Sequence, residues 1–208
     1  AWAPLALPTL IAEPTAGAEA SSELFLRAAT QLINEEGYLG ASVEKISARL
    51  NVTKGAFYHH NENKDELVVA CFERTFEVMR RAIRQAEEIS SSGLETLTTV
   101  ATALVCYQMS GNAPLLRASA LTSAPESIQP QLLAKFDRLS DRFASLISDG
   151  VADGSVRAVD TNIAAQMLTA MINAAAELHH WASDVTPQEA TELYVRPFFE
   201  GLLAPRPD

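Results

Sequence analysis

Apolar residues recur at helical spacing along most of this 208-residue chain. From Ser21 onwards they return every three or four positions, as at Leu24, Ala28 and Leu32, which is the period of an amphipathic helix. No segment alternates apolar and polar residues over the length of a strand. Only 9 glycines and 10 prolines are present, too few for the many turns of a sandwich or barrel. The sequence therefore predicts an all-α fold.

Glycine, proline and capping residues separate the expected helices. Gly37 is expected to end the first helix as a left-handed cap, and Asn51 to form a tight turn at positive φ. Ser42 and Asp160 are expected N-caps, and capping boxes are expected at Asn63–Glu66 and Thr186–Glu189. The expected helices span 21–37, 43–50, 54–60, 63–89, 94–110, 114–122, 128–150, 161–183 and 187–203.

The N-terminal 20 residues differ from the remainder. They contain Pro4, Pro8 and Pro14 and no sustained helical period, so we interpret 1–20 as an arm or linker. The rest of the chain can bury a sizeable core, because 48% of the residues are hydrophobic and 20% are charged. No apolar run approaches the roughly 20 residues that span a bilayer. Cys71 and Cys106 form no CxxC motif, which suits a reducing, cytoplasmic compartment.

Three short helices within 21–60, the last two joined by a tight turn, have the layout of a helix-turn-helix. The residues that carry this pattern are Gly37-Tyr38, Val43-Glu44-Lys45-Ile46, the run from Asn51 to His60, and Asn63-Lys64-Asp65-Glu66-Leu67. Together they closely resemble the DNA-binding head of the TetR family of bacterial transcriptional regulators. The resemblance is detailed over 21–67, which we interpret as the DNA-binding domain. The region 68–208 is similar in length and helical layout, as an effector-binding and dimerisation domain.

The resemblance implies that the third helix lies in the major groove of a double-stranded operator. Hydroxyl, imidazole and ammonium groups at its start suit phosphate oxygens, and a glycine there permits close approach. The expected DNA-binding residues are Ser42, Thr53, Lys54, Gly55, Ala56, Tyr58, His59, His60 and Lys64.

The charge of the chain argues against strong DNA binding by residues 21–67. The chain has a formal net charge of −10, and five basic against seven acidic residues lie between Ser21 and Glu66. Phosphate neutralisation supplies much of the affinity for DNA. Asn61 also stands where the family usually has a large aromatic residue. A regulatory or dimerisation module with weak or no DNA binding, possibly one unit of a longer chain, therefore stays open as an alternative.

Motifs of enzymes are missing from the sequence. It contains no GxSxG, GxxxxGK[ST], HExxH or GxGxxG pattern, so we expect no enzyme and no cofactor, and a small helical enzyme or carrier would lack a catalytic set. Glu177, His179 and His180 lie close together, but adjacent histidines on a helix point about 100° apart. We therefore expect no metal site.

Apolar and flexible side chains in the region 68–208 indicate a cavity for a small apolar effector. The resemblance implies a ligand-responsive regulator, in most members a repressor that the effector releases from its operator. The candidate effector-binding residues are Phe76, Tyr107, Met109, Phe136, Met167, Met171 and Asn173. Small apolar residues cover more than one face of 161–183, so this helix and 187–203 are expected to form a homodimer as a four-helix bundle.

Overall fold

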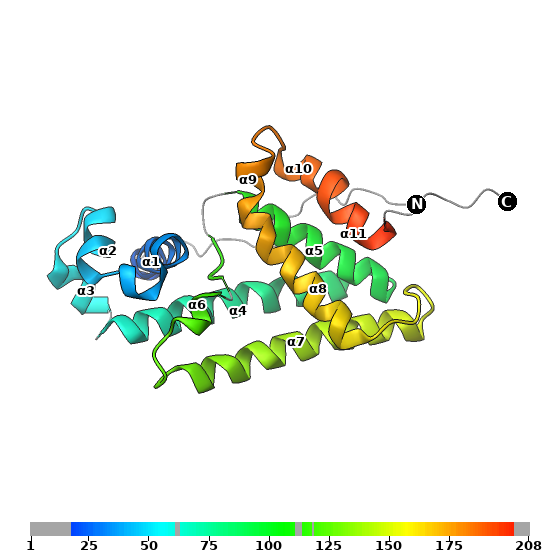
Figure 1. The fold of residues 1–208 in the computed structure, drawn as a ribbon, viewed down its shortest axis with the longest axis horizontal. Helices are drawn as coiled ribbons and strands as arrows, with labels where there is room; N and C mark the ends of the chain where they lie inside the picture. Colours follow the sequence, from blue (N-terminus) through cyan, green and yellow to red (C-terminus); the bar gives the residue numbers. More distant parts are fainter. Residues whose placement is uncertain (1–17, 61–62, 111–113, 118, 202–208) are drawn as a thin grey trace. The chain divides into compact units, whose positions relative to one another are not determined.

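The computed structural model describes residues 18–60, 63–110, 114–117 and 119–201 (Figure 1). These residues form helices and include no strand, which confirms the all-α prediction. The first four helices are α1 (Ala18–Gly40), α2 (Val43–Arg49), α3 (Lys54–His60) and α4 (Lys64–Ile89). They are followed by α5 (Gly93–Met109), α6 (Ser119–Thr122), α7 (Gln129–Ala152), α8 (Thr161–Ala174), α9 (Leu178–Trp181), α10 (Pro187–Ala190) and α11 (Arg196–Glu200). The expected arm lies outside the described residues except for its last three positions, which begin α1.

The chain divides into two compact units. The head unit comprises Ile11–Arg81 and Asn112–Asp141, and the body unit comprises Ala1–Leu10, Ala82–Gly111 and Arg142–Asp208. The long helices α4 and α7 each contribute residues to both units. The domain boundaries predicted at residues 20 and 67 stay predictions.

Each unit has its own apolar core. In the head unit, α1, α2, α3 and the start of α4 bury Phe25, Ile46, Phe57 and Leu67 almost completely. In the body unit, α5 lies beside α8 and the segment of α10 and α11 (Figure 1). Its fully buried side chains include Val100, Leu104, Phe143, Leu168 and Ile172.

The capping residues behave as predicted. Asn51 has a φ of 54°, as expected for the corner of a tight turn. Each predicted N-cap side chain accepts a hydrogen bond from a backbone amide in the first turn of its helix: Ser42 Oγ from Lys45 N at 3.3 Å, Asn63 Oδ1 from Glu66 N at 2.9 Å, and Asp160 Oδ1 from Ile163 N at 2.9 Å. Thr186 and Glu189 form a reciprocal capping box. The expected end of the first helix was only partly right. Gly37 has a φ of 74° and breaks the helical backbone there, but one more turn follows as far as Gly40.

The helix expected over 114–122 is confined to Ser119–Thr122. The described residues before it are not helical, because side chains from other helices take up their backbone groups. Asn34 donates to the carbonyl of Leu115 at 2.9 Å and accepts from the amide of Arg117 at 3.0 Å. Thr75 Oγ1 accepts from the amide of Leu116 at 2.9 Å. The prediction that a helix starts at Pro114 is therefore wrong.

The last two expected helices are interrupted. The first changes to a 3-10 turn at Ala175–Glu177 and ends at Trp181, and the second widens to a π turn at Thr191–Val195. Pro197 follows the π turn and cannot donate a backbone hydrogen bond, so it disturbs regular α-helical bonding before it. The second helix ends at Glu200, and the expected end at 203 lies outside the described residues.

Candidate nucleic-acid interface and effector region

A small apolar cluster holds α3 against the rest of the head unit. Phe57 and Ile46 are fully buried, and the Phe57 ring meets the Phe25 ring edge-on with centroids 6.2 Å apart. The turn between α2 and α3 is closed by a 3.0 Å bond from Val52 N to Ser47 O. This packing fixes which face of α3 points away from the core.

The outer face of α3 carries the predicted contact residues. Tyr58 is 57% exposed and packs edge-on against Phe57, with ring centroids 5.2 Å apart. Thr53, Lys54 and Gly55 are exposed as well. A Cβ added at Gly55 would meet only the Thr53 hydroxyl, at 3.6 Å, so another molecule has room to approach the backbone there. The side chains of Ala56, His59 and His60 lie outside the described residues.

An ion pair occupies the Lys54 ammonium. Lys54 Nζ donates to the carboxylate of Glu44, in the first turn of α2. This hydrogen bond is the largest cause that lowers the pKa of Glu44 to about 2, and the Glu44 backbone and the Ser42 hydroxyl contribute further bonds. Glu44 and Lys54 thus form an exposed ion pair between α2 and α3, close to the half-buried Ser42.

Lys64 is held by Tyr38 rather than extended into solvent. Its Nζ donates to the Tyr38 carbonyl oxygen at 2.7 Å and lies 3.8 Å from the centroid of the Tyr38 ring. Partial burial lowers the pKa of Lys64. The Tyr38 hydroxyl donates to Asp65, and burial together with this carboxylate raises the pKa of Tyr38 to about 12. The contacts of Tyr38 with Lys64 and Asp65 join the end of α1 to the start of α4.

The other cations of residues 22–66 also have carboxylate partners. Lys45 pairs with Glu36, and Arg49 pairs with Glu35 at 2.8 Å. Arg27 pairs with Glu23 at 2.9 Å. Every Lys and Arg in this stretch is therefore engaged within the chain, which the sequence spacing alone did not reveal.

A polar network that sequence reasoning missed connects α1, α4 and the segment before α6. Arg74 is 9% exposed, and its Nε donates to Glu23 at 2.6 Å. One of its terminal nitrogens donates to the Pro114 carbonyl at 3.1 Å. The available signal was an arginine among apolar positions of α4, next to Cys71 and Val78, where a charged residue needs a partner.

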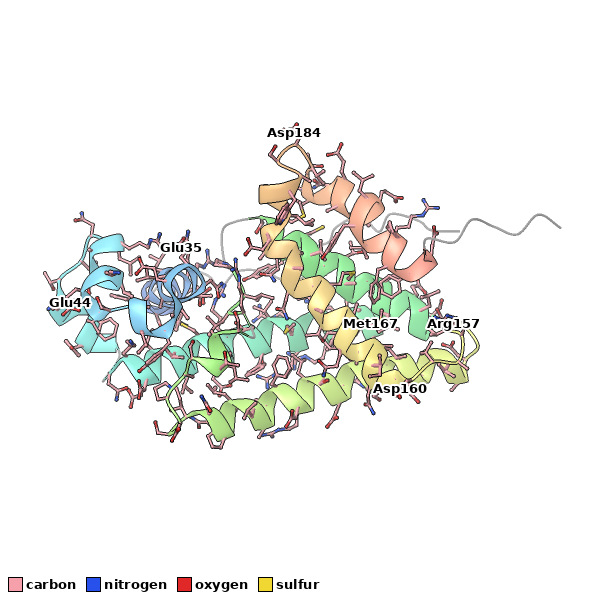
Figure 2. All side chains as sticks on the ribbon, viewed as in Figure 1. Glu35, Glu44, Arg157, Asp160, Met167 and Asp184 are labelled. Atoms are coloured by element: carbon pink, nitrogen blue, oxygen red, sulfur yellow. The ribbon has the colours of Figure 1, made fainter. Side chains whose placement is uncertain are left out.

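The candidate effector-binding residues divide between the two units. Phe76 and Phe136 belong to the head unit, and Tyr107, Met109, Met167, Met171 and Asn173 belong to the body unit. Phe76 and Met171 are buried, and Tyr107, Met109, Phe136 and Asn173 are intermediate. Met167 lies on α8 (Figure 2) and its side chain is 58% exposed. Within one chain it therefore does not line an enclosed cavity, in contrast to the prediction. Its side chain points outward because Leu168 and Met171 take the buried positions of this helix.

A surface hollow of about 480 Å³ lies in the head unit, between the start of α4 and the start of α7. It is lined by Asn63, Asp65, Glu66, Val69, Ala70, Glu73, Ile128 and Gln131. None of the predicted effector-binding residues belongs to this lining, so the hollow is not the predicted cavity.

Two buried hydroxyls of the body unit were not foreseen. Thr99 on α5 and Thr169 on α8 are 2% and 6% exposed, and within the described part of the chain their Oγ1 atoms have no hydrogen-bond partner. The two helices contact each other. The described residues also contain no group of three His, Cys, Asp or Glu side chains that could hold a metal ion, and none of their helices is both long and apolar enough to cross a bilayer.

Two family models match the chain. The model described as bacterial regulatory proteins, tetR family, matches residues 25–71. The model described as tetracyclin repressor-like, C-terminal domain, matches residues 90–202, more than half of the chain.

The chain is also similar in sequence to two individual proteins. The chain is 37% identical over 68 residues to the transposon Tn10 TetC protein of Escherichia coli, which covers 32% of this chain and 34% of that protein. It is 28% identical over 131 residues to the HTH-type transcriptional repressor DhaR of Mycobacterium sp. (strain GP1), which covers 62% of this chain and 66% of that repressor. The chain thus spans about a third and just under two thirds of the lengths of these curated relatives.

The fold is similar to that in the crystal structure of AibR in complex with isovaleryl coenzyme A and operator DNA. The TM-score is 0.71 and the sequence identity 20%, over 86% of this chain and 98% of AibR. At this identity the similarity establishes the fold alone.

Proposed function

The chain belongs to the TetR family of bacterial regulatory proteins, and we propose that it is a DNA-binding transcriptional regulator controlled by a small molecule. The observation that carries this proposal is the exposed outer face of α3, which presents Thr53, Lys54 and Tyr58 while Phe57 anchors the helix from behind. This is the arrangement in which a recognition helix enters a major groove.

In this proposal Ser42, Thr53, Lys54 and Tyr58 contact phosphates of the operator, and Gly55 allows the backbone to approach them. Ala56, His59 and His60 belong to the same interface. Lys64 belongs to the same proposed interface, but Tyr38 holds its ammonium in the free protein. To bind a phosphate, the Lys64 side chain must leave Tyr38.

We propose a homodimer that forms through α8 and the segment that follows it. Ile163, Met167, Ala170 and Ala174 are exposed and recur at helical spacing along one face of α8. Leu193 is 65% exposed on the last helical segment. An exposed apolar stripe of this length is unfavourable in water and favours an identical partner. Two heads related by a twofold axis would read two half-sites.

We further propose that the regulator is a cytoplasmic repressor and that an apolar or acyl-bearing effector weakens its binding to DNA. DhaR, a relative, is a transcriptional repressor, and AibR, which shares the fold, was crystallised with isovaleryl coenzyme A. The body unit offers Met171 as an adaptable apolar contact. Thr99 and Thr169 are candidate polar anchors, because a ligand oxygen or amide would satisfy their buried hydroxyls.

A second candidate function is a TetR-like regulatory or dimerisation module with weak or no DNA binding. The observation that favours it is the engagement of all five cations of residues 22–66 within the chain. Binding of the full chain to duplex DNA from the region flanking its own gene, measured against a scrambled duplex, separates the two candidates.

A further inference from the structure

The Glu44 carboxylate holds the cation that the proposed interface would offer to DNA. Glu44 lies in the first turn of α2 and Lys54 is the first residue of α3, so their ion pair bridges the two helices of the helix-turn-helix. The two side chains are 59% and 56% exposed, respectively. Figure 2 places Glu44 at the α2 and α3 side of the head and Glu35 on α1.

The Glu44 carboxylate lies close to a second proposed contact residue. The ammonium of Lys54 donates to it, and the Ser42 hydroxyl contributes to lowering its pKa. A glutamate carboxylate is ionised at physiological pH in any case, and the bond from Lys54 lowers its pKa further, to about 2. A carboxylate and a phosphate are both anions that accept hydrogen bonds from hydroxyl and ammonium groups. Glu44 therefore occupies the ammonium group that a DNA phosphate would require.

We propose that Glu44 is an internal competitor for DNA phosphate, which holds Lys54 in the free protein and lowers affinity for DNA of any sequence. This inference rests on the proposed DNA-binding function. Its consequence is specificity: with the sequence-independent attraction weakened, binding depends more on contacts between α3 and base edges. The regulator then occupies fewer non-specific sites.

The competition has a measurable signature in salt dependence. A cation whose charge is cancelled by an adjacent carboxylate neutralises less phosphate and releases fewer counterions. Glu44→Gln should steepen the plot of log affinity against log salt by about one ion per head, or about two per dimer. This corresponds to binding about tenfold tighter at ~50 mM salt, with the advantage nearly lost by ~200 mM.

A different role for Glu44 would give a different signature. A glutamate can accept a hydrogen bond from the amino group of cytosine in the major groove. In that case Glu44→Gln would change which sequence is preferred and would leave the salt slope unchanged.

The experiment compares four variants with the wild-type full chain by fluorescence anisotropy on labelled duplexes. One duplex comes from the region flanking the protein's own gene, and the other has a random sequence. The variants are Glu44→Gln, Lys54→Ala, the double variant, and Glu35→Gln as a matched control. Glu35→Gln removes the same charge from the head, but its partner, Arg49, is not a proposed DNA contact.

We expect Glu44→Gln to tighten binding to both duplexes by a similar factor, and Glu35→Gln to change binding much less. The gain should disappear when Lys54 is already Ala, because the two effects then share one cause. A gain that persists without Lys54, equal gains in the control, or a changed sequence preference with an unchanged slope would overturn the inference. Wild-type binding with no gain in Glu44→Gln would overturn this inference alone. No binding by any variant would overturn the DNA-binding proposal as well.

Discussion

The Arg74 guanidinium donates to the Glu23 carboxylate at 2.6 Å and joins α4 to α1 inside the head unit. The side chains are 7% and 17% exposed, so the pair is largely removed from water. Arg27 also bonds Glu23, and the Pro114 carbonyl accepts from Arg74. The charges therefore have several partners, as a buried ion pair requires.

Replacing Arg74 by Met should destabilise the protein by about 2–4 kcal/mol, because Glu23 loses its buried partner and the Pro114 carbonyl loses a donor. Urea unfolding followed by circular dichroism measures the change. Arg80→Met is the control: Arg80 lies on the same helix, but its pair with Glu77 is exposed and contributes less than about 1 kcal/mol. Equal losses in the two variants would contradict the structural role of Arg74.

In the Glu44→Gln background, replacing Lys54 by Ala should weaken binding to all DNA sequences alike and flatten the salt dependence by about one ion per head. In the wild type, where Glu44 already neutralises much of the Lys54 charge, the same replacement should flatten the salt dependence by less. The reason is that an ammonium contacts phosphate, which carries no sequence information. Lys135→Ala removes the same charge from α7 and should leave both quantities nearly unchanged. A variant that altered sequence preference at constant salt slope would assign Lys54 to base recognition instead.

Local sequence rules predicted the structure best where a single residue decides the geometry. Asn51 adopts the expected positive φ, and Ser42 caps α2 as expected. The rules failed where distant side chains decide it. Nothing local to Leu115 and Leu116 indicates that Asn34 and Thr75 bond their backbone and prevent a helix there.

The candidate interface shows the same division. The resemblance implied that Tyr58 is accessible to DNA, and the structure leaves this side chain 57% exposed. Spacing did not reveal the Lys54–Glu44 pair, because the two residues lie on different helices. Nor did it predict that Met167 faces outward, since an apolar residue on a helix is compatible with a core, a pocket or a partner.

Replacing Met167 by Glu should shift the protein from dimer to monomer, because it places a charge in the middle of the exposed stripe of α8. Sedimentation equilibrium at micromolar concentration measures the state. Leu133→Glu is the control, since Leu133 is an exposed apolar residue of α7, outside the proposed interface. A wild-type protein that is already monomeric would rule out the proposed dimer.

Replacing Thr169 by Val should leave stability unchanged or raise it by about 1 kcal/mol, because a buried hydroxyl without a partner is removed at nearly constant volume. If this hydroxyl anchors the effector, the same change should weaken effector binding about tenfold. Calorimetric titration with short acyl coenzyme A compounds, beside urea unfolding, measures the two effects. Unchanged affinity for a ligand that does bind would remove Thr169 from the effector site.

The proposed function requires that this acidic head binds specific duplex DNA, and an equilibrium titration of the wild-type chain tests this most directly. The duplexes are the region flanking its own gene and a scrambled sequence of equal length, from low to physiological salt. We predict saturable binding with a clear preference for the flanking region, and an affinity that falls linearly on logarithmic axes as salt rises. Absence of binding at low salt, or equal affinity for the two duplexes, would contradict the claim.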